Sequence, residues 1–248
     1  MQKFIRHFIL PIARSLGWKK FCEIGASAGR GTDEILRLPG ISNTVIDPGL
    51  DADLGAKYAS DPRVTVVKCN SLDALPSLQG GFDCFLIDGD HNWYTVFNEL
   101  SLIRNRGLLR RGGIIFLHDV AWPYGRRDMY YQPESIPQEF RQEYETKGMI
   151  QGKSELVDRG GWNETLCNAT HEGGARNGVL TAVEDFVREN PSEYRFCLVD
   201  LQYGLGILQF RSTRVFEAVD FRFLQVKALL YSIFGNPIYR IFGKPKRG

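Results

Sequence analysis

The sequence predicts an α/β protein built on a doubly wound, Rossmann-like sheet of seven strands. Short apolar runs alternate with amphipathic stretches through the first half of the chain. These runs are continuously apolar, which is typical of parallel strands that are buried on both faces. The last two apolar runs follow each other almost without a gap. Such a short connection allows only an antiparallel hairpin, so we expect the last strand to run against the rest.

The expected elements follow one another in a regular order. An amphipathic helix over 3–15 comes first. Strands are expected at 20–25, 43–48, 64–69, 82–89 and 112–119. The helices between them are expected at 29–38, 51–60, 71–77 and 92–106. After an irregular insertion, the chain resumes with a helix over 177–190, for which Asn177 is the expected N-cap, and with strands at 194–201 and 203–210.

Composition places the chain among ordinary globular proteins. It has 248 residues, of which 43% are hydrophobic and 24% charged, with a net charge of +2. This balance gives no reason to expect nucleic acid as a partner. No apolar run approaches the roughly 20 residues that span a bilayer, and the basic start lacks the features of a secretion signal. We therefore expect a cytoplasmic protein.

We expect a single domain over 1–248 with two unusual segments. Residues 120–174 are rich in glycine, proline and aromatic residues and show no periodicity, so we interpret them as a lid. Residues 213–248 form an apolar, aromatic tail with a basic end. Three interpretations of the tail stay open: contact with a partner or a second copy of the chain, a helix folded back on the domain, or contact with a membrane surface.

The first predicted strand leads into a glycine-rich turn, CEIGASAGRGT, over 22–32. The spacing of Gly25, Gly29 and Gly31 differs from the G-x-G-x-x-G of dinucleotide-binding folds. The turn also lacks the G-K-[ST] that ends a phosphate-binding P-loop. Considered alone, the turn is also compatible with a tight turn that binds nothing.

The next two strands also end in polar residues. Asp47 ends the second strand, where a carboxylate can accept hydrogen bonds from both hydroxyls of a ribose. Asn70 and Ser71 follow the third strand. Because doubly wound sheets bind ligands at the carboxyl ends of their strands, these residues indicate a nucleotide-like ligand.

This order of strands and motifs resembles the class I S-adenosylmethionine-dependent methyltransferases. The resemblance covers about residues 20–120 and 176–210. It implies that Glu23 meets the cofactor's ammonium group and that the glycines let the backbone approach its amino-acid end. The helix start after the turn would favour the cofactor's carboxylate. The cofactor-binding residues that the resemblance implies are Glu23, Gly25, Ala26, Ser27, Gly29, Thr32, Asp47, Asn70, Ser71 and Asp88.

A second group of polar residues follows the fourth and fifth strands. Asp88, Asp90 and His91 end the fourth, and His118 and Asp119 end the fifth. These two strands are neighbours in this fold, so the groups should converge. Helix capping is the alternative role for Asp90 and His91. For His118 and Asp119 the alternative is substrate binding without a metal.

The same group resembles the site of metal-dependent O-methyltransferases. The resemblance implies a divalent metal, magnesium or manganese, held by Asp88, His118 and Asp119. That family commonly has a carboxylate or amide oxygen where this chain has His118. His91 would be catalytic with Asp88, taking the proton from the acceptor hydroxyl, because an imidazole suits that role at neutral pH.

The function expected is methylation of a hydroxyl group on a small-molecule acceptor, such as a sugar or a glycosylated compound. The string IDGDH over 87–91 resembles a methyltransferase branch that acts on such compounds. In the insertion, Arg126 or Arg127 could meet a phosphate or carboxylate. The aromatic residues expected to stack on sugar faces are Trp122, Tyr124, Tyr130, Tyr131 and Trp162. Alternatively, these aromatic residues pack only against one another.

Two other functions stay open. One is a metal-dependent, hydroxylase-like enzyme that uses another cofactor on the same fold. The other is a non-catalytic module that binds S-adenosylmethionine. Whether the protein forms a homo-oligomer also stays open.

Overall fold

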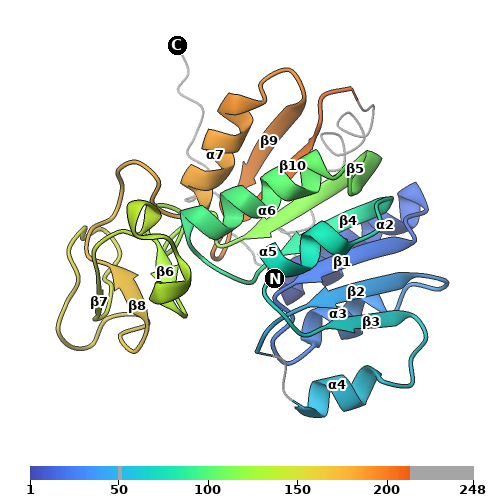
Figure 1. Ribbon diagram of the computed structural model, residues 1–248, viewed down its shortest axis with the longest axis horizontal. Helices are drawn as coiled ribbons and strands as arrows, with labels where there is room; N and C mark the ends of the chain where they lie inside the picture. Colours follow the sequence, from blue (N-terminus) through green and yellow to red (C-terminus); the bar gives the residue numbers. More distant parts are fainter. Residues whose placement is uncertain (50–51, 213–248) are drawn as a thin grey trace, which may run out of the picture. The chain divides into compact units, whose positions relative to one another are not determined.

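The computed structural model describes residues 1–49 and 52–212 (Figure 1). The tail over 213–248, for which three kinds of contact were expected, lies outside the described residues. Residues Met1–Arg211 form one compact unit.

A seven-stranded sheet with the order β3-β2-β1-β4-β5-β10-β9 forms the centre of this unit, as predicted (Figure 1). Strands β1 to β5 pair in parallel, and β10 runs antiparallel to both of its neighbours, β5 and β9. The strands of this sheet are β1 (Lys20–Ile24), β2 (Ser42–Ile46), β3 (Val64–Val67), β4 (Phe82–Ile87), β5 (Leu109–His118), β9 (Tyr194–Val199) and β10 (Leu205–Phe210).

Helices cover both faces of the sheet. On one side α5, α6 and α7 pack together, and on the other η1 packs against α3 and α2. The N-terminal segment begins with α1 (Gln2–Phe4), η1 (Ile5–Ile9) and α2 (Leu10–Leu16). The remaining helices are α3 (Arg30–Ile35), α4 (Ala52–Tyr58), α5 (Ser71–Ala74), η2 (Leu75–Ser77), α6 (Trp93–Asn105) and α7 (Val179–Glu189).

Strand β5 shows why the central runs are apolar at every position. Ile115 and Leu117 belong to the core that α6 and α7 cover. Phe116 points to the other face, where its ring packs against Phe8 and Trp18 of the N-terminal segment. Successive side chains of a strand point to opposite faces, so burial on both sides requires apolar residues throughout.

The insertion contains a small antiparallel sheet that its composition did not predict. Its strands are β6 (Met129–Tyr130), β8 (Cys167–Ala169) and β7 (Tyr144–Thr146), in that order, with short turns η3 (Pro133–Ser135) and η4 (Gln138–Phe140). Strands of two or three residues are too short to show an alternating pattern in sequence. Figure 1 shows this sheet at one end of the main sheet, beside the start of α6.

Asp128 attaches the insertion to the main fold. The carboxylate is fully buried and accepts hydrogen bonds from the backbone N–H of Trp93, at 2.7 Å, and of Gly178, at 2.6 Å. These residues stand at the starts of α6 and α7. The expected N-cap role of Asn177 is wrong, because Gly178 is the N-cap of α7. The Asn177 side chain instead accepts a hydrogen bond from the backbone N–H of Asp128.

Among the described residues, no helix is both long and apolar enough to cross a membrane.

Candidate active site

The glycine-rich turn lies directly against the end of β4. Gly25 has a φ of +83°, and a Cβ atom at this position would lie 2.3 Å from the carbonyl oxygen of Asp88. Glycine is needed here for the approach of two backbones. The turn ends at Gly29, whose φ of +71° allows it to act as the N-cap of α3. With six residues, α3 is shorter than expected.

Asp47, which directly follows β2, contacts the same turn. Its Oδ2 accepts hydrogen bonds from the backbone N–H of Ala26, at 2.9 Å, and of Ser27, at 2.8 Å. Its Oδ1 accepts one from Gly49 at 2.8 Å. The carboxylate expected to bind the ribose is therefore also the group that holds the turn in place.

Glu23 is buried among residues of the fold and not at the open edge of the sheet. It accepts hydrogen bonds from Oγ1 of Thr32, at 2.5 Å, and from Nδ2 of Asn43, at 3.1 Å. Burial raises the pKa of this carboxyl to about 7, although the two hydrogen bonds oppose the rise. Glu23 and Thr32 thus join β1 to the first turn of α3, which follows the glycines.

Ser71 makes a contact that was not predicted from the sequence. Its Oγ donates a hydrogen bond to Oε1 of Glu99 on α6, at 2.5 Å, and Glu99 is fully buried. Burial raises the pKa of Glu99 from its ordinary 4.5 to about 8, so this carboxyl is protonated at neutral pH. The sequence could have indicated that Glu99 is buried, because the helical period places it on the same face as Val96 and Ile103, which are also buried. Asn70 is the N-cap of α5, without a side-chain capping hydrogen bond.

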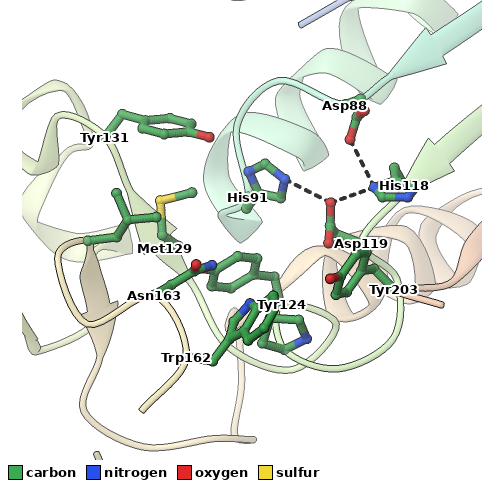
Figure 2. A pocket seen from close by; sticks show the side chains of 12 residues that line it. Asp88, His91, His118, Asp119, Tyr124, Met129, Tyr131, Trp162, Asn163 and Tyr203 are labelled. Atoms are coloured by element: carbon green, nitrogen blue, oxygen red, sulfur yellow. Dashed lines mark hydrogen bonds and ion pairs between the residues drawn. The ribbon is translucent and has the colours of Figure 1, made fainter. Parts of the chain in front are cut away.

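The residues after β4 and β5 converge as predicted. Figure 2 shows Asp119 between the two histidines, with Asp88 beside His118. Nδ1 of His118 lies 2.7 Å from Oδ2 of Asp119 and 3.0 Å from Oδ1 of Asp88. Nε2 of His91 lies 2.9 Å from the same Oδ2 of Asp119. Four side chains from two adjacent strand ends thus form one cluster.

The charges of this cluster balance one another. Burial disfavours a charge on His118, but hydrogen bonds to Asp119 and Asp88 outweigh it and raise the pKa of His118 to about 9. Burial also opposes a charge on His91, but its hydrogen bond to Asp119 and the nearby charges of Asp119, Asp88 and Asp90 together raise its pKa. For Asp119, burial is outweighed by the hydrogen bonds from both histidines, so its pKa is lowered. Protons on the histidines and a divalent cation would compete for the same carboxylates.

The donor set fits a divalent cation. Ligand atoms of Asp88, His91 and Asp119 all lie within 4.8 Å of one another. His118, the histidine expected as a ligand, contacts both carboxylates. Nδ1 of His91 is buried and has no hydrogen-bond partner. Carboxylate oxygens with one or two imidazoles suit magnesium or manganese and also tolerate iron or zinc.

Backbone strain coincides with this cluster. Asp119 has a φ of +56°, which is uncommon for a residue other than glycine. Such strain is concentrated at functional sites, where the surroundings hold a side chain in a required position. Asp90, in contrast, accepts a hydrogen bond from Oγ1 of Thr95 at 3.0 Å, close to the helix start. The N-cap of α6 is Asn92, so neither Asp90 nor His91 occupies that position.

A cavity of about 300 Å³ opens beside the cluster. The insertion supplies most of its wall, and Tyr203 comes from the turn between β9 and β10. Leu205 of β10 pairs with His118, which brings this turn to the end of β5. The lining residues are Asp88, His91, His118, Asp119, Pro123, Tyr124, Met129, Tyr131, Trp162, Asn163, Leu166 and Tyr203.

Three of the five aromatic residues expected to face an acceptor line this cavity, namely Tyr124, Tyr131 and Trp162. Trp122 lies behind Trp162, with ring centroids 6.4 Å apart. Tyr130 is buried and donates a hydrogen bond to Asp128. The sequence did not predict Met129, Asn163, Leu166 and Tyr203 as lining residues. They belong to no recognisable motif, and only the folded arrangement of the chain brings them to the cavity.

Neither Arg126 nor Arg127 lines the cavity. Arg126 forms a bidentate ion pair with Glu184 of α7 at 2.6 and 2.7 Å. Arg127 is buried and donates to the backbone carbonyls of Ala169 and Ser154. Their expected role toward a phosphate or carboxylate therefore has no basis in their positions.

Comparisons with known proteins agree with this fold. Residues 22–120 match the model of a family described as a methyltransferase domain. A solved structure of the methyltransferase PaMTH1 from Podospora anserina, with SAH bound, has a TM-score of 0.53 at 15% identity. The match covers 83% of this chain and 77% of that one. The protein thus has the fold of S-adenosylmethionine-dependent methyltransferases.

Two other solved structures, both from Burkholderia thailandensis, are less similar. An O-methyltransferase family protein has a TM-score of 0.49 at 14% identity, over 86% of this chain and 56% of that one. A 1,6-didemethyltoxoflavin-N1-methyltransferase has a TM-score of 0.48 at 17% identity, over 84% of this chain and 79% of that one. These two likenesses are too distant to bear on the chemistry. No curated protein matches the sequence.

Proposed function

We propose that the protein is an S-adenosylmethionine-dependent methyltransferase that methylates a hydroxyl oxygen of a small-molecule acceptor. The observation that carries this proposal is the contact between Gly25 and Asp88. It joins a turn of the cofactor-binding type to a cluster of carboxylates and imidazoles at the next strand end. A cavity of about 300 Å³ beside this cluster has room for part of an acceptor.

The cofactor would lie along the ends of β1, β2 and β3. Asp47 would bind the ribose hydroxyls, and the turn over 25–29 would lie against the amino-acid end. Asn70 and Ser71 would border the adenine. Glu23 and Thr32 would act through the position of α3, since both are buried and bonded to each other.

Asp88, Asp119 and one histidine would hold a divalent cation. When bound, such a cation lowers the pKa of an acceptor hydroxyl and orients it. His118 is our choice for the third ligand, because its Nδ1 already contacts both carboxylates. The short distances among Asp88, His91 and Asp119 support the alternative set, in which His91 replaces it.

His91 is then the residue that accepts the proton of the acceptor hydroxyl. It lies on the cavity side of the cluster, with its ring 5.2 Å from Tyr124 and 6.1 Å from Tyr131. Asp119 orients the imidazole through Nε2. The deprotonated oxygen would attack the sulfonium methyl group, so that a C–O bond forms while the C–S bond breaks. Positioning of the two reactants would supply much of the acceleration.

The test is transfer of a labelled methyl group from S-adenosylmethionine to hydroxylated acceptors, with cofactor binding measured separately by calorimetry. Label should appear in an ether product, and Asp119→Asn should abolish transfer while leaving cofactor affinity nearly unchanged. Cofactor binding without transfer to any acceptor would favour a binding module. Oxygen consumption without methyl transfer would favour the hydroxylase-like alternative.

A further inference from the structure

Exposed aromatic side chains gather at the mouth of the cavity. The described part of the chain has six large apolar side chains that are clearly exposed: Tyr131, Tyr144, Ile150, Trp162, Leu198 and Tyr203. Three of these line the cavity, with 58% of Tyr131, 46% of Trp162 and 37% of Tyr203 exposed. Exposed apolar groups that cluster at one opening indicate a binding surface. We call Tyr131, Trp162 and Tyr203 the aromatic rim.

The rim is continuous with the catalytic cluster. The rings of Trp162 and Tyr203 lie 6.2 Å apart at an angle of 37°, and Tyr203 lies 6.0 Å from the ring of His118. On the other side, Tyr131 lies 6.1 Å from His91. Figure 2 shows Tyr131 and Trp162 on opposite sides of the space next to His91. A ring held at the rim would therefore present its substituents to the cluster.

The wall of the cavity offers no Lys or Arg side chain among the described lining residues. The side chains of Arg126 and Arg127 are engaged elsewhere: Arg126 pairs with Glu184, and Arg127 donates to backbone carbonyls. The acidic groups that line the cavity, Asp88 and Asp119, already contact the imidazoles of His118 and His91. An anionic group on an acceptor would lose its hydration here without gaining an arginine or lysine partner.

We infer that the aromatic rim binds the face of an uncharged ring, and that the site selects neutral acceptors over acceptors with a phosphate or carboxylate close to the ring. The inference deepens the proposed function and rests on it. Aromatic side chains bind both the apolar face of a sugar ring and the face of a phenol, so these are the two sources of the shared chemistry. A CoA-linked or phosphorylated acceptor is the class that the site disfavours.

The experiment measures binding of two matched pairs by calorimetry, in the presence of S-adenosylhomocysteine and magnesium. One pair is phenyl β-glucoside and phenyl β-glucuronide, and the other is catechol and 3,4-dihydroxybenzoate. In the pair that binds, the neutral member should bind at least about tenfold more tightly than the anionic one. Which pair binds distinguishes a sugar ring from a phenol. Equal or tighter binding of the anions, or binding of none of the four probes, would overturn the inference.

Variants at the rim make the test specific. Trp162→Ala should weaken binding of the neutral probe about tenfold, and Trp162→Phe should restore most of it. Trp162→Lys should narrow or reverse the preference for the neutral member. Tyr144→Ala is the matched control, since this exposed aromatic residue of the insertion does not line the cavity. Unchanged affinity in Trp162→Ala would overturn the role of the rim.

Methyl transfer to the same four compounds separates this inference from the proposed function. Methyl transfer to the anionic compounds alone would support the proposed methyltransferase activity and overturn the inferred preference for neutral acceptors. Selective binding of a neutral probe without any methyl transfer would support the role of the aromatic rim and contradict the proposed activity.

Discussion

Gly25 and Asp88 are in direct backbone contact, so that a single methyl group on Gly25 would lie 2.3 Å from the Asp88 carbonyl oxygen. This contact joins the end of β1 to the end of β4. It places the turn that is expected to bind the cofactor beside the first residue of the carboxylate and histidine cluster. A displacement of either strand end would therefore disturb both halves of the site.

Gly25→Ala should destabilise the protein by about 2 to 5 kcal/mol, the sum of backbone strain and overpacking. Gly17→Ala is the matched control, because Gly17 also has a positive φ but has no atom within 4 Å of the added methyl group. Gly17→Ala should lower the free energy of unfolding by about 1 kcal/mol, from backbone strain alone. Chemical denaturation of both variants measures the difference. Equal losses would mean that the crowding at Gly25 is relieved by a small backbone shift.

Asp47→Ala should weaken cofactor binding by about 1.5 to 3 kcal/mol, as expected for lost charge-assisted hydrogen bonds. The variant also removes the acceptor of two N–H groups of the turn, so a second ligand is needed to separate the two effects. Calorimetry with S-adenosylhomocysteine and with its 2′,3′-dideoxy analogue, which lacks both ribose hydroxyls, separates the two effects. If Asp47 binds the ribose, the analogue should bind the variant and the wild type with more similar affinities. The same loss for both ligands would limit Asp47 to support of the turn.

The roles of the two histidines can be separated by metal binding. His118→Ala should weaken manganese binding, measured by calorimetry, and methyl transfer together. His91→Ala should keep the metal and lower the rate by about 100-fold to 10,000-fold, the usual contribution of a positioned base. A chelator should abolish turnover of the wild type while cofactor binding stays nearly intact. If His91→Ala loses manganese and His118→Ala does not, the ligand set is Asp88, His91 and Asp119.

Glu99 should make stability fall as pH rises. Its carboxyl ionises near 4.5 when exposed and near 8 in the folded protein. Between these values the folded state binds more protons than the unfolded one, so its contribution is complete below about pH 4.5 and is lost as pH rises to about 8. Glu99→Gln removes this titration. The stability of the wild type relative to the variant should fall by a few kcal/mol at most between about pH 5 and pH 8.

Glu34→Gln is the control of opposite sign for Glu99. A hydrogen bond from Arg6 lowers the pKa of buried Glu34, so its contribution is present above its unfolded pKa and is lost in acid. Relative to this variant, the stability of the wild type should be nearly constant between about pH 5 and pH 8 and should fall below that range. Parallel curves for Glu99→Gln and the wild type would show that Glu99 is ionised in the folded state.

The main sheet was predictable because burial on both faces leaves a simple signal. Every central strand had to be apolar throughout, and the polar residues Asp47, Asp88 and His118 then marked the strand ends. The convergence of Asp88, His91, His118 and Asp119 followed from the rule that the ends of neighbouring parallel strands meet. This rule places side chains at the same edge but gives no distances between them, so it could not decide which histidine lies nearest to the carboxylates.

Other features depend on contacts between distant segments. The hydrogen bond from Ser71 to Glu99 joins residues 28 positions apart, and the bonds from the turn to Asp47 involve backbone groups that no sequence pattern marks. Tyr203 reaches the cavity only because β10 pairs with β5. The part of the insertion that forms the cavity wall is the least predictable. Its strands are too short to show a periodic sequence pattern. Arg127 and Asp128, which hold it in place, resemble surface charges in the sequence.

The pairing of β6 with β8 has a consequence for how the wall of the cavity can vary. Met129 lies opposite Asn168 and Tyr130 opposite Cys167, so the chain leaves the fold and returns to it at adjacent points. The intervening loop over 131–166 carries Trp162, Asn163 and Leu166, while Asp128 remains attached to the starts of α6 and α7. The loop can therefore be exchanged for one of another length or sequence without moving the ends of the main strands. In the methyltransferase proposed here, the choice of acceptor could therefore change with this loop while the residues at the strand ends stay in place.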